Sequence, residues 1–212
     1  ARPMDEFGAS LALTPHGTVA ILGGPGRDGL SQADQGAAAV FVLENVQIAD
    51  PDDNPLTEQR WTQRGGLLTP TDAAAGDGFG SAVALSTDGN IALLAGKGAD
   101  VRGEVDQGSA RIFTFGPAGW MPSAAVLTPS DGAAGDMFGH AAAMNGAGSL
   151  VILGGPGDDV SGRLDQGSAR IFTSGAMGWT QFPAALTAPD GMAGDMLGWS
   201  AAMTRNGTAA IL

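Results

Sequence analysis

Short runs of apolar and small residues alternate with glycine- and aspartate-containing turns along the whole chain. Within one representative stretch, this pattern predicts four strands, at 79–85, 91–94, 109–114 and 120–127. Asp88-Gly89 lies between the first two strands and suits the positive φ angles of a type I′ hairpin turn. Four short antiparallel strands in about 60 residues predict one blade of a β-propeller.

The same pattern recurs along the chain. Phe79-Gly80 returns 59 positions later as Phe138-Gly139 and 59 positions after that as Leu197-Gly198, and an earlier copy is Phe7-Gly8. This repeat predicts that residues 1–212 are one all-β propeller segment, with blades at roughly 5–76, 77–135 and 136–194 and a partial blade at 195–212. Trp61, Trp120 and Trp179 keep the same spacing, so the extra 13 residues of the first unit fall within the hairpin between its third and fourth strands, roughly between positions 44 and 59.

The residue sizes within each unit predict the order of its strands. The strand after each Phe-Gly is the poorest in bulk, which places it innermost, where the blades converge; the tryptophan strand is then outermost. A propeller needs about four to eight blades to close. We therefore expect either further blades in a longer chain or self-association, completing a ring of about seven blades.

The charge and composition exclude several classes of function. The net charge is −12, and Lys97 is the only lysine, so the basic stripe that nucleic acids require is missing. Cysteine is absent, which excludes disulfides, thiolate zinc sites and cysteine nucleophiles. No apolar run approaches the roughly 20 residues of a membrane-spanning helix. Cations are the expected ligands of such an acidic chain. The alternative is that the acidic residues only increase solubility.

The segments 131–139, 150–156 and 165–172 together resemble the bacterial FG-GAP repeat, which is related to the repeats of the integrin α-subunit propeller. The resemblance covers essentially the whole chain. It implies a secreted or cell-surface β-propeller, commonly of seven blades, that serves adhesion and ligand binding. It also implies that Phe-Gly and the Gly-Gly-Pro motif, at 23–25 and 154–156, form a packing cage between blades. Two positions depart from the pattern: Lys97 stands where a proline is expected, and Leu197 replaces the phenylalanine.

Repeated aspartate pairs are the candidate metal ligands. Calcium takes about six to eight hard oxygens at flexible spacing, which glycine-rich acidic loops supply. The candidates lie in the loop after Gly-Gly-Pro: Asp28 and Asp34, Asp100 and Asp106, and Asp159 and Asp165, with Glu104 and Asp158 as further oxygen donors. The alternative is that these aspartates cap turns by accepting backbone N–H groups. The Asp-x-Asp-x-Asp-Gly calcium loop of integrin-type blades is missing from the hairpins.

Other repeated charges have simpler interpretations. A second set of aspartates, in the linkers between blades, is expected to build rigid turns: Asp72 and Asp77, Asp131 and Asp136, and Asp190 and Asp195. Arg111 and Arg170 also repeat, with Ala39 at the equivalent position of the first unit, and we expect them to pair with carboxylates at the surface.

The residues that break the period are the candidate ligand contacts. Asp50, Asp52 and Asp53 lie in the insertion of the first unit. His140 and Trp199 occupy equivalent positions directly after Phe-Gly or its variant, on the strand expected to face the central channel. Trp199 could stack on a sugar, and a structural role is the alternative for His140.

The sequence therefore favours a non-enzymatic, extracellular or surface-attached module that presents loops to a protein or glycan ligand, with calcium as the candidate cofactor. The alternative is a structural or accessory subunit docked in a larger assembly. A glycan-processing enzyme domain is less favoured, because no acid–base pair stands out at non-repeated positions.

Overall fold

The computed structural model describes residues 5–29, 32–48 and 56–212. Within them it contains strands but no helix, and hence no helix that could span a membrane. The strands are β1 (Ser10–Leu13), β2 (Val19–Gly24), β3 (Ala37–Ile48), β4 (Leu56–Gln63), β5 (Phe79–Leu85), β6 (Ile91–Gly96), β7 (Ser109–Gly116), β8 (Gly119–Leu127), β9 (Ala141–Met144), β10 (Leu150–Gly155), β11 (Ser168–Gly175), β12 (Gly178–Gln181), β13 (Ala202–Met203) and β14 (Ala210–Ile211).

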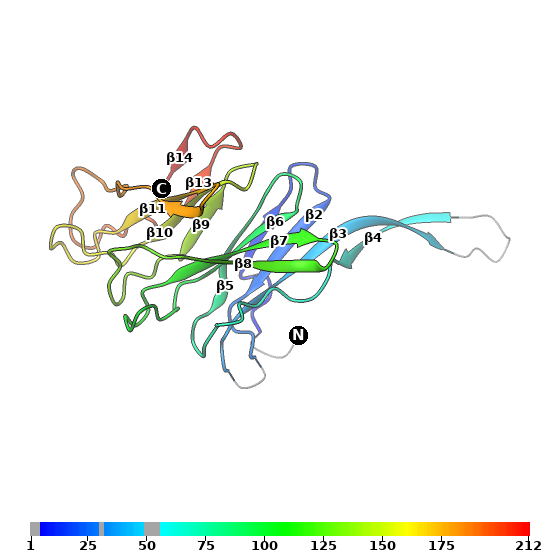
Figure 1. The fold of residues 1–212 in the computed structure, drawn as a ribbon, viewed down its shortest axis with the longest axis horizontal. Helices are drawn as coiled ribbons and strands as arrows, with labels where there is room; N and C mark the ends of the chain where they lie inside the picture. The colour runs from blue at the N-terminus through cyan, green and yellow to red at the C-terminus, as the bar shows by residue number, and fades with distance from the viewer. Residues whose placement is uncertain (1–4, 30–31, 49–55) are drawn as a thin grey trace.

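Three sheets each contain four antiparallel strands in chain order, β1 to β4, β5 to β8 and β9 to β12, and β13 pairs with β14. In the second sheet, all four predicted strands are confirmed, each ending within two residues of its expected bounds. Figure 1 shows the sheets fanned side by side. The predicted all-β architecture of propeller blades is therefore confirmed.

The hairpin between β5 and β6 differs from the expected type I′ turn. Gly89 has a φ of 68°, but Asp88 is not among the residues with positive φ. The Asp88 carboxylate instead accepts hydrogen bonds from the Ser86 hydroxyl at 2.6 Å and the Asn90 backbone N–H at 3.0 Å. These bonds hold Asp88 in an ordinary conformation, so a single left-handed residue, Gly89, completes the turn.

The innermost strands are those that follow Phe-Gly or its variant, as expected. β5 contacts β1 on one side and β9 on the other, and β9 contacts β13. The tryptophan strands β4, β8 and β12 lie at the opposite edges of their sheets. Because the inner strands are rich in alanine and glycine, neighbouring backbones can approach closely where the blades converge.

Each hydrophobic core lies between two blades. The first joins Val19, Ile21 and Val40 of the first sheet to Phe79 and Leu94 of the second. Phe79 and Phe138 are both completely buried. Full burial of one such side chain contributes about 2–3 kcal/mol, so the blades stabilise one another.

The tryptophan series confirms this arrangement for two of its three members. Trp120 packs against the core between the first and second blades, and its indole N–H donates to the Arg64 carbonyl at 2.9 Å. Trp179 packs against the next core. Trp61 is 46% exposed. Trp61 is more exposed than Trp120 and Trp179 because it lies on the first sheet, and the described residues contain no preceding blade for it to pack against.

A backbone junction joins each blade to the next. Between the second and third blades, three N–H groups of the linker donate to three successive carbonyls of the Asp-Gln-Gly loop: Gly135 to Val105 at 2.9 Å, Met137 to Asp106 at 3.0 Å and Phe138 to Gln107 at 2.9 Å. Asp106 and Gly108 have φ values of 54° and 83°. A β-carbon on Gly108 would lie 2.0 Å from the Phe138 carbonyl oxygen, so this position requires glycine.

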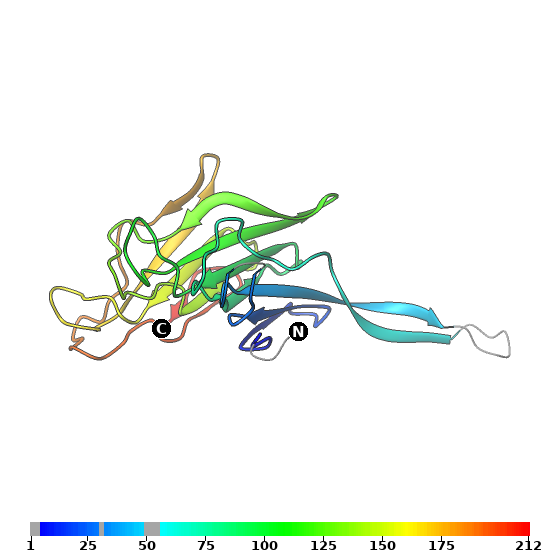
Figure 2. The ribbon, with the colours of Figure 1, turned by 90° about the horizontal axis from the view of Figure 1, so that it is seen from below.

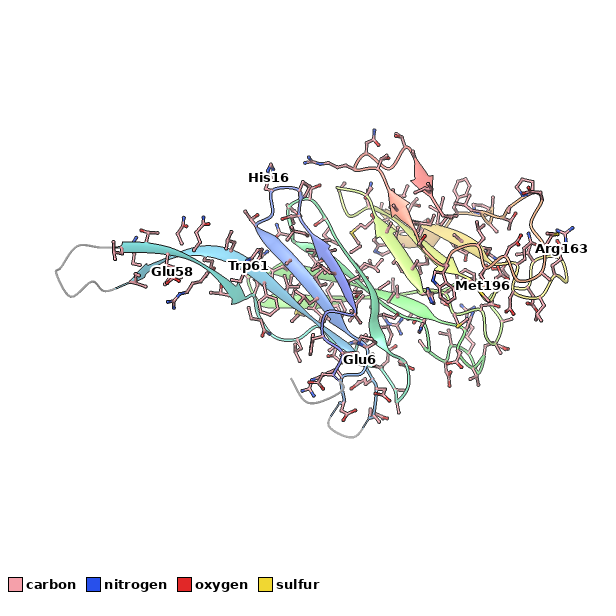
Figure 3. The ribbon with its side chains drawn as sticks, turned by 180° about the vertical axis from the view of Figure 1, so that it is seen from behind. Glu6, His16, Glu58, Trp61, Arg163 and Met196 are labelled. Carbon is pink, nitrogen blue, oxygen red and sulfur yellow. The ribbon has the colours of Figure 1, made fainter. Side chains whose placement is uncertain are left out.

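The first blade carries a long hairpin arm formed by the ends of β3 and β4. Its register runs from Phe41 opposite Gln63 to Ile48 opposite Leu56. Figure 2 shows this arm extending away from the fanned sheets, and Figure 3 places Glu58 and Trp61 on it. The inserted residues therefore lengthen the outer hairpin, as expected from their position in the sequence.

Candidate functional site

The repeated arginines are buried, contrary to the expectation of surface pairing. Arg111 and Arg170 are only 8% and 5% exposed. Each guanidinium binds a carboxylate 39 residues earlier and lies over the phenylalanine of its own blade: Arg111 pairs with Asp72 at 2.7 Å over Phe79, and Arg170 pairs with Asp131 at 2.9 Å over Phe138. The hydrogen bond from Arg111 lowers the pKa of Asp72. Each arginine therefore holds the linker that precedes its blade against that blade.

The other linker aspartates cap turns. Asp77, Asp136 and Asp195 each accept the backbone N–H of the residue three positions earlier, at 2.7, 2.7 and 2.6 Å respectively. Asp136 is buried, and desolvation, reinforced by the charges of Asp158 and Asp159, raises its pKa to about 6. The hydrogen bond from Ala133 opposes this shift.

The aspartate pairs proposed for calcium also make local hydrogen bonds. Asp28, Asp100 and Asp159 accept the backbone N–H of Asp34, Asp106 and Asp165, at 3.2, 2.9 and 2.9 Å. Asp158 accepts from the Ser168 hydroxyl and the Arg170 guanidinium. In the described parts of the chain, no three carboxylate or imidazole groups come together as a metal site would require. The geometry fits turn capping better than a carboxylate cage, and calcium binding stays the alternative hypothesis for these loops.

The acidic candidates of the insertion, Asp50, Asp52 and Asp53, lie outside the described residues. Glu104 is exposed, and its backbone exchanges hydrogen bonds with Val101 in a small closed turn. Neither observation brings these carboxylates to a shared site.

The structure brings together His140 and Trp199, which the sequence separates by 59 residues. The His140 Nδ1–H donates to the Trp199 carbonyl at 3.2 Å, and the two ring centroids lie 4.3 Å apart at a tilt of 42°. Trp199 is 57% exposed, so one side of its ring remains available. An exposed indole next to an imidazole can stack on a sugar ring or receive an apolar side chain.

Lys97 belongs to the same inner rim. Its positive charge adds to burial in lowering the pKa of His140. The Lys97 backbone N–H donates to the Ser81 hydroxyl at 3.3 Å, a bond that the proline of the other units cannot make. Ser81 occupies the position equivalent to His140 and Trp199 and itself donates to the Ala95 carbonyl at 3.1 Å.

A groove of about 480 Å³ borders this rim, and its lining includes Glu6, Ser81, Lys97, Asp106 and Met137. It combines an ammonium group, two carboxylates, a hydroxyl and exposed backbone. Ala9, Pro25 and Met137 add apolar surface to the same groove. A lining that is both charged and apolar suits a peptide or a sugar, which carries both kinds of group. We define the inner-rim site as Ser81, Lys97, His140 and Trp199.

Sequence reasoning selected His140 and Trp199 but treated Lys97 only as a change in blade packing. The signal for including it was present: Lys97 is the only lysine and replaces a repeated proline. Its proximity to His140 could not be deduced, because it depends on how successive blades are stacked.

Comparison with known proteins agrees with this architecture. A model of the FG-GAP repeat matches residues 61–113 and 122–172. No curated protein matches the chain in sequence.

Solved structures resemble the chain at low identity. Hydrazine synthase of Kuenenia stuttgartiensis is 13% identical, with a TM-score of 0.47 over 94% of this chain and 53% of that one. A candidate 6-phosphogluconolactonase from Bacteroides uniformis ATCC 8492 is also 13% identical, with a TM-score of 0.45 over 84% of this chain and 40% of that one. The chain thus spans 53% and 40% of the lengths of these two structures.

Proposed function

Because the chain is an FG-GAP repeat protein built from β-propeller blades, we propose that it is a non-enzymatic module that binds a protein or glycan ligand at its inner rim. We place this activity outside the cell or at its surface, where the family resemblance implies adhesion. Loops and inner strands held on a rigid scaffold are a common way to present binding residues.

One observation carries the proposal. The residues that break the repeat at the inner rim lie in consecutive blades and contact or influence one another, while the repeated polar residues are engaged in structural bonds. Lys97, His140 and Trp199 come from the second, third and fourth units. A residue type that repeats in every blade indicates a structural role that all blades share. Residues that break the repeat together at one place therefore favour a specific contact with a ligand.

The non-enzymatic part of the proposal rests on the repeated carboxylates. Asp72 and Asp131 bind guanidinium groups, and Asp77 and Asp136 accept backbone N–H groups. A carboxylate held in this way is poorly placed to transfer protons to a substrate.

The test is binding of the purified chain to arrays of defined glycans and of synthetic peptides. We expect Trp199→Ala and His140→Ala to weaken a wild-type signal about tenfold, as loss of a central contact does. Trp61→Ala is the matched control, because Trp61 is also half exposed but lies on the arm. Equal losses in all three variants, or no ligand on either array, would contradict the proposal.

The arm favours a second candidate, an accessory subunit docked in a larger assembly. Leu56 and Trp61 are 47% and 46% exposed on a hairpin that lacks a covering layer in the described structure. Exposed apolar residues on a projecting hairpin are typical of an interaction surface. Copurification of one defined partner that Trp61→Ala releases and Trp199→Ala does not would support this candidate over the first.

A further inference from the structure

Four equivalent positions at each blade junction hold larger and more apolar residues at the third junction than at the first. At the first junction they are Ala33, Ala74, Gly78 and Ser81; at the second, Val105, Ala133, Met137 and His140; and at the third, Leu164, Met192, Met196 and Trp199. The backbone pattern is the same at all three junctions, so the change affects the surface rather than the fold. We call the third set the junction patch.

Backbone hydrogen bonds bring the segments that carry the four positions of the junction patch close together. The Leu164 carbonyl accepts the Gly194 N–H at 2.9 Å, which brings its loop against the linker that carries Met192 and Met196. The Trp199 N–H donates to the Met196 carbonyl at 3.2 Å, so the patch continues into the inner-rim site. Figure 3 shows Met196 and Arg163, the neighbour of Leu164, at the same end of the molecule.

The patch is open to solvent. Leu164 and Met192 are 64% and 67% exposed, and Met196 is 41% exposed. The equivalent Val105 is 57% exposed although a complete third blade follows its junction. The position that Val105 and Leu164 share is therefore exposed even between two complete blades. A cluster of large exposed apolar side chains marks an interaction site, and methionine adapts readily to different partners.

The surrounding charges are mainly negative. Asp165 follows Leu164 directly, the Asp195 carboxylate accepts the Met192 N–H at 2.6 Å, and Asp190 lies two residues before Met192. Arg163 is the neighbouring cation, and it donates to the Gln166 side chain at 3.5 Å. The chain as a whole carries a net charge of −12, which attracts cationic partners and repels acidic ones.

From this combination we propose that the junction patch docks a cationic, amphipathic segment of a partner protein. Apolar side chains of the segment pack on Leu164, Met192 and Met196, and its lysines or arginines lie against the flanking aspartates. This inference rests on the proposed binding function and names its ligand class: a protein segment, not a glycan.

The test uses the complete chain and a fluorescein-labelled synthetic peptide of alternating leucine and lysine, followed by fluorescence anisotropy. The double variant Leu164→Ser, Met192→Ser should bind about tenfold more weakly. The matched control is Val105→Ser, Ala133→Ser, which changes the same positions at the second junction and should bind within about twofold of wild type. Circular dichroism and thermal melting show that both double variants are folded.

Two further peptides separate the contributions of charge and apolar contact. A glutamate–leucine peptide and a lysine–serine peptide should both bind at least about tenfold more weakly than the lysine–leucine peptide. Equal affinity for the glutamate–leucine peptide, equal loss in the two double variants, or no binding of the lysine–leucine peptide would each overturn the proposal.

The outcome is distinguishable from failure of the proposed function. If Trp199→Ala and His140→Ala abolish binding of an array ligand while the junction variant binds it normally, the binding module stands and the junction patch is not its protein site. If neither set of variants changes any interaction, both proposals fail.

Discussion

The guanidinium of Arg170 binds the carboxylate of Asp131 at 2.9 Å and also reaches Asp158 at 3.2 Å. Asp131 lies in the linker that enters the third blade, and Arg170 lies on the third strand of that blade. The guanidinium also lies over the ring of Phe138, at 5.3 Å from its centroid. One buried cation therefore fixes the linker, the loop and the aromatic side chain at the centre of the blade junction.

Arg170→Met should destabilise the chain while preserving most of the packing on Phe138. The variant leaves Asp158, a largely buried carboxylate, without its cation. We expect the free energy of unfolding to fall by about 2 kcal/mol, the usual cost of losing hydrogen bonds to a charged group. Urea denaturation measures it. Arg205→Met is the control, because Arg205 is exposed and makes no ion pair within the described residues. An equal loss of unfolding free energy in Arg205→Met would refute a special role for Arg170.

Gly108→Ala should disrupt the junction between the second and third blades. Its β-carbon would meet backbone atoms of Phe138 at 2.0 and 2.5 Å, and backbone cannot move aside cheaply. We expect a loss of more than about 3 kcal/mol or failure to fold. Gly103→Ala is a matched control with a φ of 92° and open space around it, so it isolates the cost of left-handed backbone, about 1 kcal/mol. Similar losses in both variants would show that the close approach is not the cause.

Asp136→Asn should change how stability depends on pH. Burial raises the pKa of Asp136 to about 6, above its ordinary value of 3.8, so the ionised carboxylate costs stability at neutral pH. As pH falls through about 6 the folded protein takes up this proton first, and the penalty disappears by about pH 4. Asparagine retains an oxygen for the Ala133 N–H but never ionises.

The expected result is that Asp136→Asn is more stable than wild type at pH 8 and that this advantage shrinks as pH falls from about 6 to about 4. Denaturation curves at intervals across this range measure the difference. A variant that is equally destabilised at every pH would instead show that the negative charge at this turn is favourable.

The aspartate pairs of the Asp-Gln-Gly loops should hold their turns without a metal. We expect excess EDTA and millimolar calcium chloride to change the melting temperature by less than about 2 °C. Asp100→Ala should cost about 1 kcal/mol in either solution, because it removes the oxygen that accepts the Asp106 N–H at 2.9 Å. A calcium-induced rise in wild type that Asp100→Ala loses would support the calcium-binding alternative.

Much of the fold could be predicted because its signals are local and repeated. Alternation at 109–114, small residues after each Phe-Gly and the Asp-Gly turns predicted the strands of the second blade, which the structure confirms as β5 to β8. The type of the β5–β6 turn could not be predicted in the same way. It depends on two hydrogen bonds to the Asp88 carboxylate, which competes with the left-handed conformation that Asp-Gly otherwise favours.

The sequence alone determined the blade, its strand order, its period and the places where the period breaks, since each follows from the spacing of side chains along one strand or turn. Tertiary structure decided which distant residues meet. The burial of Arg170 over Phe138 and the contact of His140 with Trp199 join residues 32 and 59 positions apart. Such contacts depend on the angle at which one twisted sheet stacks on the next, which no local pattern encodes.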